Sequence, residues 1–70
     1  MHFTKYLDEI NALANKQGYL GYLIADLGIS EFLEDFQDGV TVEESLRRVW
    51  SYDEVQANLN SFRIYARGKV

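Results

Sequence analysis

Apolar residues recur at three- and four-residue intervals along most of the chain, which is the spacing of one face of an α-helix. This period predicts five helices, over about residues 3–17, 19–27, 31–37, 42–50 and 52–67. The positions that set the period are Phe3, Leu7, Ile10 and Ala14; Leu20, Leu23, Ile24 and Leu27; Phe32, Leu33 and Phe36; Val42, Leu46, Val49 and Trp50; and Val55, Leu59, Phe62 and Ala66. A strand over residues 62–66, where apolar residues alternate, is the rival interpretation, but the helical stripe is longer. We therefore expect an all-α fold, a compact small bundle of four to five short helices in a single domain over residues 1–70.

Residues that favour helix termini flank these apolar segments. Three glycines each follow a segment, at the place where a left-handed residue closes a helix: Gly18, Gly28 and Gly39. Ser30 is expected to cap the third helix. Residues 41–44 (Thr-Val-Glu-Glu) and 51–54 (Ser-Tyr-Asp-Glu) match the capping box, and Trp50 before the second box can pack on Val55. The agreement of caps, stops and period supports the helical fold.

Gly21 lies inside the second predicted helix and leaves two interpretations open. A glycine within a helix costs about 1 kcal/mol relative to alanine, so close packing against another helix would explain it. The alternative is that the helix breaks at Gly21, which the sequence does not decide.

Size and composition limit the chemistry that the chain can carry. Seventy residues form one small domain, which buries only about 60–65% of its unfolded surface, so a partner or a second copy is the expected source of extra stability. There is no cysteine and only one histidine, His2. Disulfides and thiolate metal sites are therefore excluded, and a Ser-His or Cys-His pair would have to recruit His2. We predict no enzyme activity, no catalytic residue, no metal site and no cofactor.

The hydropathy of the chain predicts no contact with a membrane. Its longest apolar stretch, residues 20–25, is too short to span a bilayer, and the N-terminal residues lack the apolar run of a signal peptide. The absence of cysteine fits a reducing cytosol, so a cytoplasmic location is expected. Such a composition suits the accessory proteins of bacteria and their phages.

Charge is distributed unevenly along the chain, whose net charge is −4. Residues 17–46 contain no lysine or arginine and seven acids: Asp26, Glu31, Glu34, Asp35, Asp38, Glu43 and Glu44. The first turn of a helix favours acids, which accounts for Glu31, Glu43 and Glu44. Glu34, Asp35 and Asp38 lie toward the C-terminus of the third predicted helix, where the dipole disfavours them, so they lack a local explanation.

The acids of the third predicted helix form the candidate partner-binding site. Glu31, Glu34, Asp35 and Asp38 recur at helical spacing, and we expect them to share a face opposite the apolar residues of that helix. A solvated face that maintains solubility is the simpler interpretation. The functional hypothesis is a regulator or inhibitor that binds a larger protein with a basic surface. That partner could handle nucleic acid, with the acids standing in for phosphates.

The C-terminal end suggests two alternatives. Arg63, Arg67 and Lys69 alternate there with Phe62 and Tyr65. This end could meet the acidic middle of its own chain or of another copy, and the second case would make the chain a self-associating structural domain or homodimer. It could also bind nucleic acid weakly, although a helix dipole alone explains cations at a C-terminus.

DNA binding through the middle of the chain is disfavoured. Residues 24–30, followed by a helix, are similar in pattern to the turn of a helix-turn-helix motif. The recognition helix would be the third predicted helix, which carries acids and no lysine or arginine. DNA affinity depends largely on cations that contact phosphates, so this helix is poorly suited to bind DNA.

Overall fold

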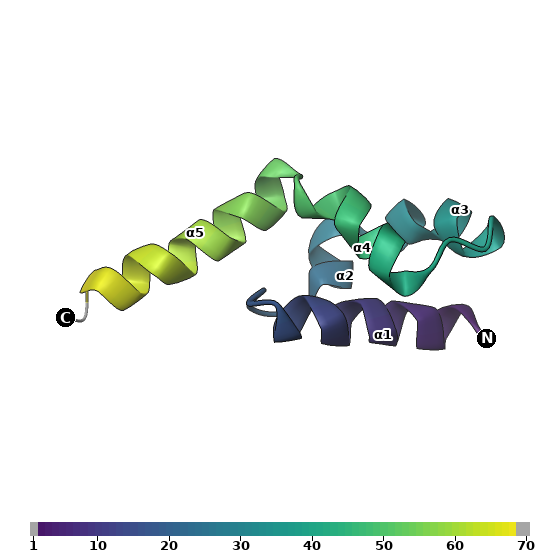
Figure 1. The fold of residues 1–70 in the computed structure, drawn as a ribbon, viewed down its shortest axis with the longest axis horizontal. Coiled ribbons are helices and arrows are strands. Elements are labelled where there is room, and N and C mark those ends of the chain that lie inside the picture. The colour runs from purple at the N-terminus through teal and green to yellow at the C-terminus, as the bar shows by residue number, and fades with distance from the viewer. Residues whose placement is uncertain (1, 69–70) are drawn as a thin grey trace.

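The chain folds into five α-helices in a computed structural model, which describes the backbone of residues 2–68 and the side chains of residues 2–61. The helices are α1 (Phe3–Lys16), α2 (Leu23–Leu27), α3 (Ser30–Gln37), α4 (Val42–Trp50) and α5 (Asp53–Gly68). Residues 2–68 contain no strand, so the predicted all-α fold is confirmed, and the rival strand over residues 62–66 is wrong. Figure 1 shows the five helices in chain order.

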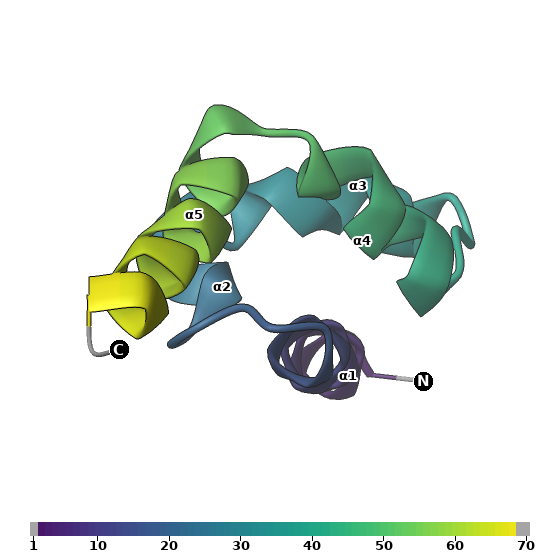
Figure 2. The same ribbon diagram turned by 60° about the vertical axis from the view of Figure 1, so that its left-hand side comes forward.

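The helices form a small bundle from which α5 extends. α1 packs against α2, α3 and α4, and α5 packs against α2 and α4. Figures 1 and 2 show α5 running away from the other helices toward one end of the molecule, while the α3–α4 turn lies at the opposite end. This arrangement gives an elongated molecule of 44 × 19 × 18 Å.

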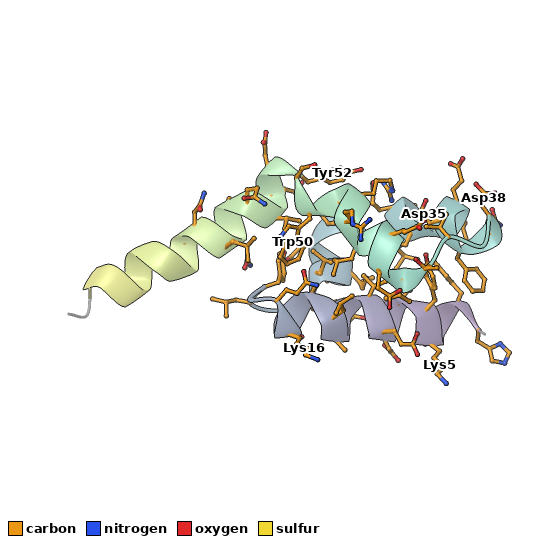
Figure 3. The ribbon with its side chains drawn as sticks, viewed as in Figure 1. Lys5, Lys16, Asp35, Asp38, Trp50 and Tyr52 are labelled. Carbon is orange, nitrogen blue, oxygen red and sulfur yellow. The ribbon has the colours of Figure 1, made fainter. Side chains whose placement is uncertain are left out.

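One apolar cluster holds the bundle together. The buried residues are Tyr6, Leu7, Ile10, Ala14, Tyr19, Leu23, Ile24, Phe32, Leu46, Val49 and Val55. The ring of Phe36 adds to them, because its centroid lies 5.1 Å from that of Phe3 and 5.3 Å from that of Tyr6. Trp50, expected to pack near Val55, belongs to the same cluster and lies beside the end of α1 (Figure 3).

Two residues expected to face inward are exposed. Leu33 is 41% exposed because α3 turns Phe32 and Phe36 toward the core, and Leu33 lies about 100° around the helix from Phe32. Leu20 is 50% exposed because the chain around it is not helical.

The second predicted helix breaks at Gly21, and α2 begins only at Leu23. Gly21 has φ +96°, and a Cβ built on it would have no neighbour within 4 Å. The close-packing explanation is therefore wrong, and the break is correct. The side-chain amide of Asn15 supports the resulting loop by donating to the carbonyl oxygens of Tyr19 and Gly21, both at 2.9 Å.

The glycines predicted to stop helices do so. Their φ angles are positive, at 108° for Gly18, 95° for Gly28 and 75° for Gly39. After Gly39, the amide of Val40 donates to the carbonyl of Asp35 at 2.9 Å, while the Gly39 amide donates to Phe36. This pair of bonds is the Schellman motif, and the same pattern closes α1 at Gly18.

Of the three predicted N-terminal caps, one is confirmed. The Thr41 hydroxyl accepts from the Glu44 amide at 3.2 Å. Ser30 is wrong as a cap, because Ile29 before it already has helical angles, and Ser30 lies inside α3. Ser51 is also wrong, because its helical angles make it the C-cap of α4, and α5 begins at Asp53.

Candidate protein-interaction surface

The four acids predicted to bind a partner differ in exposure. Glu34 and Asp38 are exposed, whereas the side chains of Glu31 and Asp35 retain only 30% and 16% of their accessible surface. Figure 3 marks Asp38 near the end of α3 and Asp35 one turn earlier. The structure therefore divides the predicted set into two pairs.

Arg48 of α4 neutralises the less exposed pair. Its Nη1 donates to Glu31 Oε1 at 2.8 Å, and its Nε donates to Asp35 Oδ2 at 2.9 Å. Its Nη2 also donates to the backbone carbonyl of Glu31 at 2.8 Å. One guanidinium thus fixes two carboxylates one turn apart and joins α3 to α4.

Two hydroxyl groups complete this network. Ser45, fully buried on α4, donates to Asp35 Oδ2 at 2.7 Å. Tyr52 donates to Glu31 Oε1 and accepts from Arg48 Nη1 at 2.7 Å. These bonds explain why Asp35 occupies a position that the helix dipole disfavours.

The network shifts three pKa values. The hydrogen bond from Arg48 lowers the pKa of Glu31, and the bond from Tyr52 acts in the same direction. The hydrogen bond to Glu31 raises the pKa of Arg48 and also that of Tyr52. These shifts favour the charged carboxylate, the charged guanidinium and the neutral phenol.

None of Ser45, Arg48 and Tyr52 was predicted from the sequence, because a cation in the last turn of a helix, such as Arg48, is already explained by the helix dipole. One signal pointed to Arg48: Glu31 and Asp35, four residues apart, repel each other, and a nearby cation removes that cost.

Four exposed acids lie at one end of the molecule. Glu34 and Asp38 lie at the end of α3, and Glu43 and Glu44 lie in the first turn of α4. We call these four exposed residues the acidic end. Among the described side chains, none of the four has a cation within ion-pair distance. Lys5 and Lys16 point from α1 to the side away from α3 and α4 (Figure 3).

A groove of about 740 Å³ lies beside the acidic end, between α1 and the α3–α4 turn. Leu13, Phe36 and Val42 give it an apolar floor, and each is only partly buried. Glu9 of α1 and Glu43 of α4 also line it. The Tyr6 hydroxyl donates to the Val40 carbonyl at 2.8 Å, which holds the turn against α1.

The chain matches no family model, no curated protein and no solved structure. Interpretation of this surface therefore depends on its own geometry and charge.

Two further observations bear on other functions. Among the residues described, none of the helices combines the length and apolar character that crossing a membrane requires. The same part of the chain brings no three potential metal ligands together. The basic C-terminal end, with Arg63, Arg67 and Lys69, lies outside the described side chains.

Proposed function

We propose that the chain is a non-enzymatic protein-interaction module that regulates or inhibits a larger protein by binding its basic surface. The partner we favour handles nucleic acid, so that carboxylates occupy the place of phosphates. The binding surface is the acidic end, formed by Glu34, Asp38, Glu43 and Glu44. The observation that supports this proposal is a difference in charge pairing. Arg48 neutralises Glu31 and Asp35 within the molecule, whereas among the described side chains no cation lies within ion-pair distance of the acidic end.

Unneutralised acids at one end carry a cost that binding to a cation would remove. Like charges one turn apart, such as Glu34 and Asp38, oppose a helix by about 0.2–0.5 kcal/mol per pair. Opposite charges across an interface steer the encounter and raise the association rate. Exposed charges are screened within about 8 Å at physiological salt, so the association rate should fall as salt is added.

The test is a charge reversal that substitutes no residue of the Arg48 network. The variant Glu34→Lys with Asp38→Lys changes only exposed acids of the acidic end. Its matched control, Asp8→Lys with Asp53→Lys, makes the same change in net charge at exposed positions of α1 and α5. Circular dichroism should show unchanged helicity for both variants.

The immobilised chain is first used to capture proteins from host lysate at low salt, and mass spectrometry identifies them. Association rates with the purified captured protein are then measured from about 50 to 500 mM salt. We expect the acidic-end variant to bind about tenfold more slowly or worse, and the control to bind like the wild type. Equal binding by both variants, or a captured set without basic proteins, would contradict the proposal.

A further inference from the structure

The groove beside the acidic end combines apolar and acidic lining residues. Its floor is apolar, formed by Leu13, Phe36 and Val42. Among the described residues that line it, two are acids, Glu9 and Glu43, and none is basic. An amphipathic helix with apolar residues on one face and cations beside that face suits such a groove.

The last nine residues of the chain have this composition. Residues 62–70 contain three cations and no acid, together with Phe62, Ile64 and Tyr65. In the sequence, Phe62, Tyr65 and Ala66 recur at the spacing of one helix face, and Arg63 and Arg67 are also four residues apart. The backbone of residues 62–68 belongs to α5.

The same molecule cannot fill its own groove while α5 keeps its direction. A helix of 16 residues is about 24 Å long. Figures 1 and 2 show that α5 carries its far end away from the α3–α4 turn, which contributes one wall of the groove. If residues 62–70 occupy the groove, they must therefore come from another copy.

We propose that the groove binds residues 62–70 of a second copy of this chain. This inference goes beyond the proposed function and does not depend on it. Phe62 and Tyr65 of one copy would cover the apolar floor of the other, while Arg63 and Arg67 would meet Glu9 and Glu43. Arginine suits this role because its planar guanidinium binds a carboxylate through two hydrogen bonds. Reciprocal docking gives a closed dimer, and one-way docking gives an open chain of copies.

The first experiment measures the mass of the full chain by sedimentation at several concentrations and at low and high salt. We expect a mass of at least twice 8.1 kDa at high concentration and low salt, and dissociation as salt is raised. A monomer under all of these conditions overturns the proposal.

The second experiment exchanges the charges of the two surfaces. The groove variant carries Glu9→Lys with Glu43→Lys, and the tail variant carries Arg63→Glu with Arg67→Glu. Each should associate about tenfold more weakly than the wild type, because like charges then meet. An equimolar mixture should recover association, since the acidic tail of one variant matches the basic groove of the other. Failure of the mixture to associate, with both variants helical by circular dichroism, overturns the proposal.

A matched control separates docking from net charge. Asp8 and Asp53 are exposed acids that belong neither to the groove nor to the acidic end. The variant Asp8→Lys with Asp53→Lys has the net charge of the groove variant and should associate like the wild type. If it weakens association equally, general charge repulsion explains the effect and the groove assignment fails.

A third measurement does not depend on any variant that must fold. A synthetic peptide of residues 61–70 is added to the isotopically labelled wild-type chain, and chemical shifts are recorded by NMR. We expect the largest changes at Leu13, Phe36 and Val42. Changes confined to other surfaces, or no change at millimolar peptide, overturn the proposal.

Discussion

Replacing Arg48 by methionine tests whether its network stabilises the fold. Methionine keeps a long, flexible side chain and a helix propensity close to that of arginine, so the change removes mainly the charge and the hydrogen bonds. It leaves Glu31 and Asp35 facing each other without a cation, and it removes the donor that Arg48 provides to Tyr52.

The expected loss in the free energy of unfolding lies between the loss for an exposed ion pair and the loss for a buried one. Exposed pairs contribute about 0.2–1 kcal/mol, whereas breaking a buried pair costs about 3–5 kcal/mol. The Arg48 side chain is 39% exposed, but that of Asp35 is only 16% exposed. With about 1 kcal/mol for each of two carboxylate partners, we expect a loss of about 2 kcal/mol in the free energy of unfolding. For a domain of this size, that loss lowers the melting temperature by about 10 °C.

The assay is urea and thermal unfolding, followed by circular dichroism at pH 7. Arg47→Met is the control, because Arg47 is an exposed neighbour on the same helix and forms no ion pair among the described side chains. Its effect should stay within about 0.5 kcal/mol. Equal destabilisation by the two variants would refute the stabilising role of the network.

The pH dependence gives an independent check on the same reasoning. Because the folded-state pKa of Glu31 is lowered from its ordinary value of 4.5, its stabilising contribution is present above that value. The contribution is lost as the pH falls through the lower folded-state pKa. The difference in stability between wild type and Arg48→Met should therefore be largest near pH 7 and shrink in acid. A difference that stays constant down to pH 2 would contradict this explanation.

Three further predictions concern Thr41, Gly39 and Tyr19. Thr41→Ala removes the cap of α4 and should cost about 1 kcal/mol in urea unfolding, whereas Thr41→Ser should retain most of the stability. Gly39→Ala should cost about 1–2 kcal/mol because φ is +75°, and Gly39→Asn should cost less; equal costs would contradict the role of the left-handed angle. Burial and the hydrogen bond to Asp26 raise the pKa of Tyr19, and the hydrogen bond to Glu31 raises the pKa of Tyr52, so absorbance near 295 nm should show both phenols ionising above pH 10. Tyr19→Phe should reduce the amplitude of this late phase, and an unchanged amplitude would contradict the assignment to Tyr19.

The helices were predictable where the local signals agree. The apolar stripe of α1 and the Thr41 cap of α4 are each specified by residues close in sequence. Gly21 was not decided, because the apolar spacing around it fits both a helix and a break. The break is stabilised by Asn15 and by Asn58, which pairs with the backbone of Leu20 at a separation of 38 residues. Periodicity along the chain does not report such a contact.

For the candidate surface too, local signals were predictable and contacts between distant residues were not. Sequence reasoning explained Glu31 by the helix start but placed all four acids of α3 on one partner-binding face. Their separation depends on Arg48, which lies 13 residues beyond Asp35 and reaches it only because α3 and α4 lie side by side. Glu34 and Asp38 are exposed because Phe32 and Phe36 turn another face of α3 toward the core. The groove was not predictable, because Glu9 and Glu43 come from helices that meet only in the folded state.

The pairing of Asn58 with Leu20 makes one backbone amide a reporter on α5. The Leu20 amide lies in a loop, yet it donates to Asn58 Oδ1 at 2.9 Å, and Asn58 Nδ2 donates back to the Leu20 carbonyl at 2.8 Å. Loop amides normally exchange their hydrogen with water quickly, whereas a bonded amide exchanges only when its partner moves away. Deuterium uptake at the Leu20 amide therefore measures how often α5 separates from the loop that contains Leu20.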